Sequence, residues 1–199
     1  MFKKPKNYDQ LKEGYETLTP GGHKCVIKEA REDKDNNGKD ILVIYFDTDA
    51  TDVQPKFFSN RYLNDSRKDK KWPAGGQKTL WVESEWFDGQ LSKITGAIEK
   101  SDPNAKIWDS SDNLVLDALK NAKVGIVFGQ EEYTKADYTM GVAVKPRYFC
   151  GFDEALEQKI PERKVSKNKP ELPPNANKSI PEWLDVKADN LEDEGLPFK

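Results

Sequence analysis

The sequence predicts a mainly β domain, in which five antiparallel strands form a small barrel with one helix between strands 3 and 4, followed by a disordered acidic tail. Three observations predict it. Short β-type runs recur up to residue 150, one amphipathic helical stripe lies between the third and fourth of them, and the composition changes near residue 161. Only 36% of the 199 residues are hydrophobic, which favours one compact domain with a polar extension.

The first two predicted strands form a hairpin. Residues 23–31 alternate loosely between apolar and polar side chains, and residues 41–46 form a continuous β-branched and aromatic run, typical of a fully buried strand. Between them, residues 35–38 are Asp-Asn-Asn-Gly. This is a strong turn signal, because Asn and Gly adopt positive φ angles at low cost.

The sequence predicts only short strands between residues 56 and 82. Residues 56–58 and 61–63 combine aromatic, aliphatic and basic side chains and predict a short strand. A long polar loop follows over residues 64–76, and residues 79–82 predict a further short strand after it.

One helix follows these strands. From Trp86 to Ile98, apolar side chains recur three or four residues apart after an adjacent first pair, which predicts an amphipathic helix over residues 84–100. Ser84 is the predicted N-cap, since its hydroxyl can accept a free backbone N–H of the first turn. Residues 102–104, Asp-Pro-Asn, end the helix.

Two longer strands complete the domain, over residues 123–133 and 140–150. The first is predicted to bury the face that carries Val124, Ile126 and Phe128. Pro146 in the second indicates an edge or a bulge, because proline has no N–H for the ladder. This order is that of an oligonucleotide/oligosaccharide-binding (OB) fold, although a helix on one face of an antiparallel α+β sheet would give the same order.

The composition divides the chain into three parts. We expect a flexible segment at residues 1–13, the OB-like domain at residues 14–160, and a disordered Pro-rich linker and acidic tail at residues 161–199, where apolar residues are too few to offset chain entropy. The net charge is -3, but the last nineteen residues hold six acids and two lysines, which leaves 30 bases against 29 acids elsewhere. The mildly acidic average therefore hides a near-neutral body and an acidic tail.

An enzyme is not predicted, and neither is a metal site. The chain has one histidine, His23, and two distant cysteines, Cys25 and Cys150, which suit a buried strand better than a catalytic or zinc site. Carboxylate-only Mg²⁺ sites remain compatible with the sequence. No apolar run is long enough to span a bilayer, and no apolar signal core follows the first lysines, so we expect a cytoplasmic protein that is not membrane-bound.

Nucleic-acid binding is predicted from an interleaved basic and aromatic stretch. Flat rings stack on bases and cations follow the phosphates, so a single-strand site needs both kinds of side chain. The stretch holds Lys56, Phe57, Phe58, Arg61, Tyr62, Arg67, Lys68, Lys70, Lys71 and Trp72, and the last strand adds Lys145, Arg147 and Tyr148. Neighbours on a strand face opposite ways, so one of the two adjacent phenylalanines is expected in the core.

The end of the sequence resembles the acidic tip of bacterial single-stranded DNA-binding proteins. The matching residues are Glu192, Asp193, Glu194, Leu196, Pro197 and Phe198. The resemblance implies that the tip docks on partner proteins, and the same acids could also compete for a basic groove. One departure is Lys199, which follows Phe198 where the family has a free carboxylate.

The body resembles single-stranded DNA-binding replication or recombination proteins from phages of Gram-positive bacteria. The resemblance spans roughly residues 15–150 and is most specific at residues 69–73, Asp-Lys-Lys-Trp-Pro; weaker matches lie at residues 15–22, 94–101 and 124–133. It implies an OB-type domain, no cofactor, and binding of single-stranded DNA without strong sequence preference in the host cytoplasm, with replication or recombination proteins as partners.

Two alternatives stay open at this point. One is a protein-interaction adaptor of a replication complex that has no DNA groove of its own, and the other is a DNA-processing enzyme or a subunit of one. The sequence also leaves the oligomeric state open, a homodimer included.

Overall fold

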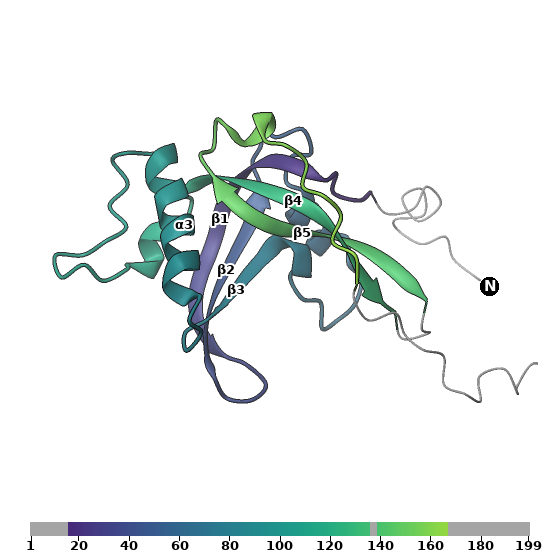
Figure 1. The fold of residues 1–199 in the computed structure, drawn as a ribbon, viewed down its shortest axis with the longest axis horizontal. Helices are drawn as coiled ribbons and strands as arrows, with labels where there is room; N and C mark the ends of the chain where they lie inside the picture. Colours follow the sequence, from purple (N-terminus) through teal and green to yellow (C-terminus); the bar gives the residue numbers. More distant parts are fainter. Residues whose placement is uncertain (1–15, 136–138, 167–199) are drawn as a thin grey trace, which may run out of the picture.

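The computed structural model describes residues 16–135 and 139–166, which form a five-stranded antiparallel sheet of order β3-β2-β1-β4-β5 (Figure 1). The strands are β1 (Gly21–Lys34), β2 (Asp40–Thr48), β3 (Gln77–Trp81), β4 (Lys123–Thr134) and β5 (Met140–Cys150). The mainly β, antiparallel prediction is confirmed. The sheet is not closed, because β3 and β5 are its two edges, so the predicted barrel closure is not observed. The predicted segment 1–13 and the tail after Ser166 lie outside the described residues.

Strand β1 joins the two halves of the sheet. Residues 21–26 pair with β4, whereas residues 25–34 pair with β2 in the predicted hairpin. A register shift between Ile27 and Glu29 marks a bulge, which bends a strand and increases its twist. In the turn, Gly38 has a φ of 78°, a conformation that glycine adopts without strain.

The predicted strand at residues 56–63 is a helix instead. α2 (Phe57–Leu63) follows β2 after residues 49–56, and side chains at the end of β2 accept hydrogen bonds from its first backbone N–H groups. Thr48 Oγ1 accepts from the Phe57 N–H at 2.8 Å, and Asp47 Oδ1 accepts from the Phe58 N–H at 2.8 Å. This buried cap comes from another element, so the local sequence pattern could not reveal it.

Helix α3 (Phe87–Ser101) confirms the predicted helix, but it begins three residues later than predicted. Ser84 is not its N-cap. The Ser84 Oγ accepts the backbone N–H of Trp86 at 3.2 Å in the preceding turn. Trp86 itself is 67% exposed and does not belong to the buried stripe. The buried face of the helix packs against β4 and β5 and consists of Ile94, Thr95, Ala97 and Ile98.

The core lies between the sheet, α2 and α3. Phe46 of β2 contacts three other phenylalanine rings in edge-on geometry, those of Phe58, Phe128 and Phe149, at centroid distances of 6.0, 6.1 and 6.2 Å. Edge-to-face pairs add to the stability that burial provides. Strand β2 is buried along most of its length, as predicted for residues 41–46. The short 3₁₀ turns are η1 (Ala74–Gly76), η2 (Leu116–Leu119) and η3 (Ala155–Glu157).

Strand β5 is both an edge and bulged, so both predictions from Pro146 are confirmed. Pro146 pairs with Phe128 and Tyr148 with Val127, which leaves Arg147 as the extra residue. Beyond β5, residues 160–166 form a segment that we call the strap. Residues 161–166 were predicted to belong to the disordered linker, but in the structure Lys164 bridges Glu131 of β4, beyond residues 123–128, which pair with β1.

Two hydrogen bonds hold the strap. The Lys164 N–H donates to the Gln130 carbonyl at 2.9 Å, and the Glu132 N–H donates to the Lys164 carbonyl at 3.0 Å. Arg163 adds an ion pair with Glu132 at 2.8 Å. The strap therefore ends, at Ser166, beside the protruding ends of β4 and β5.

Candidate nucleic-acid interface

A groove of about 670 Å³ lies between residues 17–20, the region from α2 to η1, and the protruding ends of β4 and β5. Six of the residues predicted from the sequence line it: Phe57, Phe58, Arg61, Arg67, Lys71 and Trp72. The long loop after α2 is thus folded back against the sheet rather than extended into solvent. This groove is our candidate interface.

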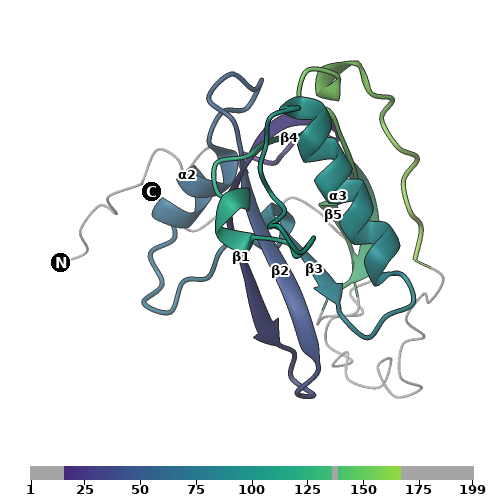
Figure 2. The ribbon, with the colours of Figure 1, turned by 90° about the vertical axis from the view of Figure 1, so that its left-hand side faces the viewer.

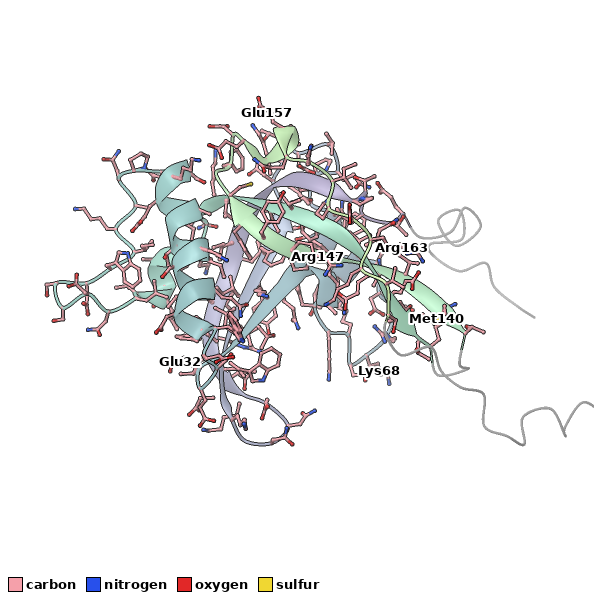
Figure 3. All side chains as sticks on the ribbon, viewed as in Figure 1. Glu32, Lys68, Met140, Arg147, Glu157 and Arg163 are labelled. Atoms are coloured by element: carbon pink, nitrogen blue, oxygen red, sulfur yellow. The ribbon has the colours of Figure 1, made fainter. Side chains whose placement is uncertain are left out.

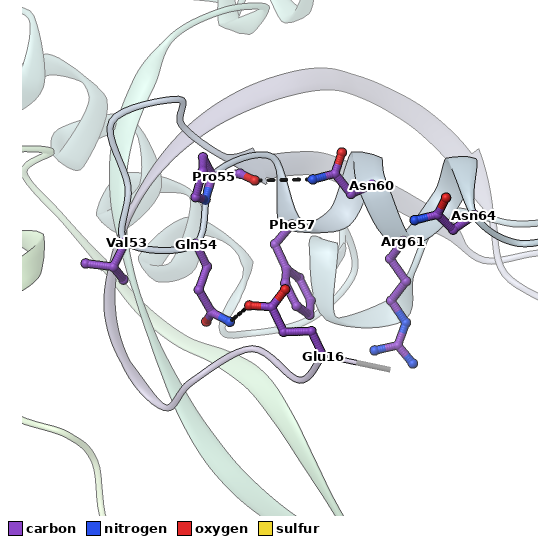
Figure 4. Close-up of a pocket in the computed structure, with 8 residues that line it drawn as sticks. All are labelled: Glu16, Val53, Gln54, Pro55, Phe57, Asn60, Arg61 and Asn64. Carbon is purple, nitrogen blue, oxygen red and sulfur yellow. Dashed lines mark hydrogen bonds between the residues drawn. The ribbon is translucent and has the colours of Figure 1, made fainter. Parts of the chain in front are cut away.

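A second hollow of about 290 Å³ adjoins the groove, because Phe57 and Arg61 line both (Figure 4). Its other walls combine polar side chains with the apolar Val53 and Pro55. The Gln54 amide donates to Glu16 Oε1, and the Asn60 amide donates to the Pro55 carbonyl at 3.4 Å. The groove and this hollow therefore share a wall formed by α2.

The floor of the groove holds Trp72 in a fixed position. Its indole N–H donates to the Gly76 carbonyl at 2.9 Å, and its ring packs partly against the core. A Cβ at Gly76 would stand 2.5 Å from Trp72 Nε1 and 2.7 Å from Phe58 Cγ. Glycine is therefore required at position 76, where the backbone passes close to the two rings. The hydrogen bond and the packing hold the half-buried ring of Trp72 in one position.

The three basic side chains of the groove differ in their partners. Arg61 and Lys71 are exposed and make no ion pair with another described residue. Arg67 instead donates from Nε to both carboxylate oxygens of Asp65 at 3.0 Å, and its Nη2 lies 2.7 Å from Oδ2. Hydrogen bonds from the side chain and the backbone N–H of Arg67 lower the pKa of Asp65 to about 2. Arg61 and Lys71 are thus the free cations of the groove lining.

The remaining residues of the interleaved stretch lie beside the groove. The Lys70 Nζ lies 4.7 Å from the ring centroid of Tyr62, and that ring lies 5.8 Å from the ring of Trp72. Lys68 is exposed on the same loop. Lys56 occupies the position before α2 with a φ of 53°, a left-handed conformation that costs a non-glycine residue energy.

Phe57 and Phe58 belong to the core rather than to the surface. They are only 7% and 3% exposed, and their rings contact each other at 5.2 Å. One of the two was expected in the core, but both are buried, because the segment is a helix that packs on β2. Little of either ring remains for stacking on a base.

The three residues predicted on the last strand do not join the groove. Lys145 and Arg147 both approach Glu131, at 3.8 and 3.3 Å, and Arg147 also donates to the Gln130 carbonyl at 2.7 Å. Tyr148 donates to the carbonyl of Lys159, just before the strap, at 3.5 Å. Figure 3 labels Arg147 on β5 and Arg163 on the strap. The partners of these three side chains are therefore Glu131, the Gln130 carbonyl and the Lys159 carbonyl.

Sequence reasoning missed the side of the groove formed by β4 and β5. Tyr133 is 43% exposed and Val142 is 44% exposed, and both line the groove together with Gln130. The alternation of apolar and polar residues along a strand does not show how far a pair of strands extends beyond the rest of the sheet. The alternation of β4 predicted a buried face correctly but could not place Tyr133 in the same groove as Trp72.

The wall at residues 17–20 is anchored by a buried histidine. The two nitrogens of His23 face Asp52 Oδ2 at 2.8 Å and the Thr19 carbonyl at 2.9 Å. Burial raises the pKa of Asp52, but hydrogen bonds from His23 and from the backbone N–H groups of Gln54 and Lys24 outweigh it and lower the pKa overall. The prediction that His23 is a structural strand-start residue fits this anchoring.

Other predicted features fall outside what the structure describes or outside this site. The tail residues Glu192, Asp193, Glu194, Leu196, Pro197 and Phe198 lie outside the described residues. Within residues 16–135 and 139–166, no cluster of His, Cys, Asp or Glu could hold a metal ion. No helix in that part of the chain is long and apolar enough to cross a membrane.

Comparison with models of known protein families finds no match to this chain, and a search of curated proteins finds no match either. The residues and their geometry therefore carry the functional argument.

Proposed function

We propose that this protein binds single-stranded DNA in the groove without strong sequence preference. One observation carries the proposal: Arg61 and Lys71, which have no carboxylate partner among the described residues, line the same groove as the fixed ring of Trp72 and the exposed ring of Tyr133. Cations that follow phosphates and rings that stack on any base are the two requirements of such a site. The proposed contacts to DNA no longer include five of the residues predicted from the sequence: Phe57, Phe58, Lys145, Arg147 and Tyr148.

The topology supports an OB-like interpretation of the open sheet. The order β3-β2-β1-β4-β5 is that of an OB barrel opened between its third and fifth strands, and a bent β1 that pairs with both β2 and β4 suits such a barrel. The groove adjoins the ends of β4 and β5, where OB folds bind ligands. The β1–β2 turn departs from that pattern because it lies at the far end of the sheet (Figure 2).

We propose further that the acidic tail competes for the groove and recruits partner proteins. The strap supports this, because the Ser166 N–H donates to Glu132 Oε2 at 3.3 Å and the neighbouring Tyr133 lines the groove. Ser166, the last described residue, is thus held beside β4, one of the two strands that line the groove. A role in phage DNA replication or recombination is proposed from the resemblance at residues 69–73.

A titration with oligo-dT, followed by tryptophan fluorescence, tests the proposal. We expect saturable quenching at low salt that weakens as salt rises, because phosphate binding releases counterions. Trp72→Phe should remove most of the quenching while keeping a ring in place, and it is a better probe than Trp72→Ala, which would also disturb the core. Absence of quenching, or quenching indifferent to salt, would contradict the proposal and favour the adaptor alternative.

A further inference from the structure

A second exposed aromatic surface lies at the opposite end of β2 from the groove. Trp81, Val82 and Trp86 are 50, 43 and 67% exposed, on the turn between β3 and α3. The turn is well defined, since the Ser84 N–H donates to the Trp81 carbonyl at 3.0 Å and the Ser84 Oγ accepts from the Trp86 N–H. Two large indoles exposed on a fixed turn indicate a surface that contacts another molecule.

The charges around these rings are acidic. Within residues 32–40 and 81–88 there are seven acids and two lysines. Both lysines are already paired, Lys34 with Asp40 at 2.6 Å and Lys39 with Glu83 at 3.8 Å. Glu85 and Asp88 make no ion pair with a described residue. We call Trp81, Val82, Glu83, Glu85, Trp86 and Asp88 the acidic tryptophan surface. It would repel phosphates, so its partner is cationic and carries an apolar side chain.

The chain itself contains a segment of that chemistry. Residues 1–6 are Met-Phe-Lys-Lys-Pro-Lys, which combine an aromatic ring with three lysines and no acid. Phenylalanine can pack on an indole edge, and lysine can lie over an indole face while its ammonium approaches a carboxylate. The basic loop at residues 67–71 is a poorer partner because it borders the groove.

We propose that the acidic tryptophan surface binds residues 1–6 of a second copy of this chain. Reach favours a second copy over the same chain. Glu16 is bonded to Gln54 near the end of β2, whereas Trp81 pairs with Ile41 near its start. The ten steps from residue 6 to residue 16 span at most about 36 Å when fully extended, and β2 alone is about 27 Å long, so an intramolecular contact requires a nearly extended chain.

The contact is heterologous, because it joins different surfaces of two copies. Such contacts form closed rings where the rotation between copies closes, and open chains of copies where it does not. If the groove binds single-stranded DNA, as proposed above, copies aligned along one strand present each segment to its neighbour at high effective concentration. The second-copy contact would then couple adjacent binding events, and this coupling alone rests on the proposed function.

Peptide binding tests the contact without nucleic acid. A labelled peptide of residues 1–10 is titrated with the full chain carrying K3E, K4E and K6E, so that its own segment does not compete. We expect saturable binding that Trp86→Ala or Glu85→Lys weakens about fivefold to tenfold, because one contact of this kind contributes up to roughly one power of ten in affinity. Trp108→Ala, at another exposed tryptophan, is the matched control. No binding, or equal loss from Trp86→Ala and Trp108→Ala, overturns the proposal.

Oligonucleotide length separates this proposal from the proposed function. The full chain should bind a long oligo-dT more tightly per copy than a short one that holds a single copy. K3E/K4E/K6E should abolish that advantage, and adding E83K, E85K and D88K to the same chain should restore it by charge exchange. Binding to both oligonucleotides without a length advantage rejects the contact alone. Peptide binding without any oligonucleotide binding rejects the proposed function alone.

Discussion

The two ends of β2 carry opposite charges and different kinds of tryptophan. Residues 56–72, at the groove, hold six bases and two acids, whereas residues 32–40 and 81–88, at the other end, hold seven acids and two lysines. Trp72 is half-buried and hydrogen-bonded to Gly76, whereas Trp86 is 67% exposed. A fixed ring beside free cations suits stacking on bases, and an exposed ring among carboxylates suits a cationic protein segment. The net charge of -3 describes neither end.

Charge reversal at each end is the strongest way to break this comparison. Arg61→Glu with Lys71→Glu should weaken binding of a short oligo-dT on the order of 100-fold at low salt, because two phosphate contacts become repulsive. Glu83→Lys with Glu85→Lys, at the other end, should leave that affinity unchanged. Equal effects of the two double variants in a fluorescence titration would show that overall charge, and not the groove, governs binding.

Removal of the acidic tail should have the next largest effect. Deletion of residues 182–199 should tighten oligo-dT binding about tenfold at low salt, since six acids no longer compete with phosphates for the basic end. The gain should vanish at high salt, where screening weakens the competition. A full-length chain with those six acids changed to amides is the control for length. Unchanged or weaker binding after either change would reject the competition.

A smaller effect is expected from freeing Arg67. The pKa of Asp65 is about 2, so this carboxylate stays ionised and paired from neutral pH down to pH 4, and the pair is lost only as the pH falls through about 2. Asp65→Asn should therefore tighten binding about threefold and steepen the salt dependence by about 0.7, the value of one added phosphate contact. A salt titration of both proteins measures this. An unchanged slope would mean that Arg67 does not reach a phosphate.

The smallest effect concerns Lys56, which has a φ of 53° before α2. Lys56→Gly should raise the free energy of unfolding by about 1 kcal/mol, because glycine adopts this conformation without strain. The expected rise in Tm is about 2–4 °C for a chain of this size. Thermal unfolding measures it, with Lys68→Gly as a control on an exposed loop. A lower Tm for Lys56→Gly would contradict the strain at this position.

Sequence patterns predicted the elements whose signals are local. The hairpin, the buried run at residues 41–46 and the edge strand with Pro146 all follow from the order of apolar and turn-forming residues. Helix α2 could not be predicted, because Asp47 and Thr48 of a preceding strand cap it. Barrel closure depends on how two distant edges approach, and alternation within each strand contains no information on that.

The candidate site was predictable in part for the same reason. The interleaved stretch correctly brought Arg61, Lys71 and Trp72 together, because they lie within one loop and the helix before it. Arg147 and Lys145 had the right chemistry, but both pair with Glu131 of β4. This pairing depends on the register between β4 and β5, which the spacing within either strand does not reveal.

Gly76 makes the binding surface sensitive to a change that removes no functional group. Any side chain there would meet Trp72 Nε1 at 2.5 Å, so the indole would have to leave its position while every cation of the groove stayed in place. A survey of tolerated substitutions should therefore find this position as restrictive as a contact residue, although glycine touches no nucleotide. Selection that maintains the groove would therefore keep glycine at position 76, because the backbone there leaves no space for a side chain.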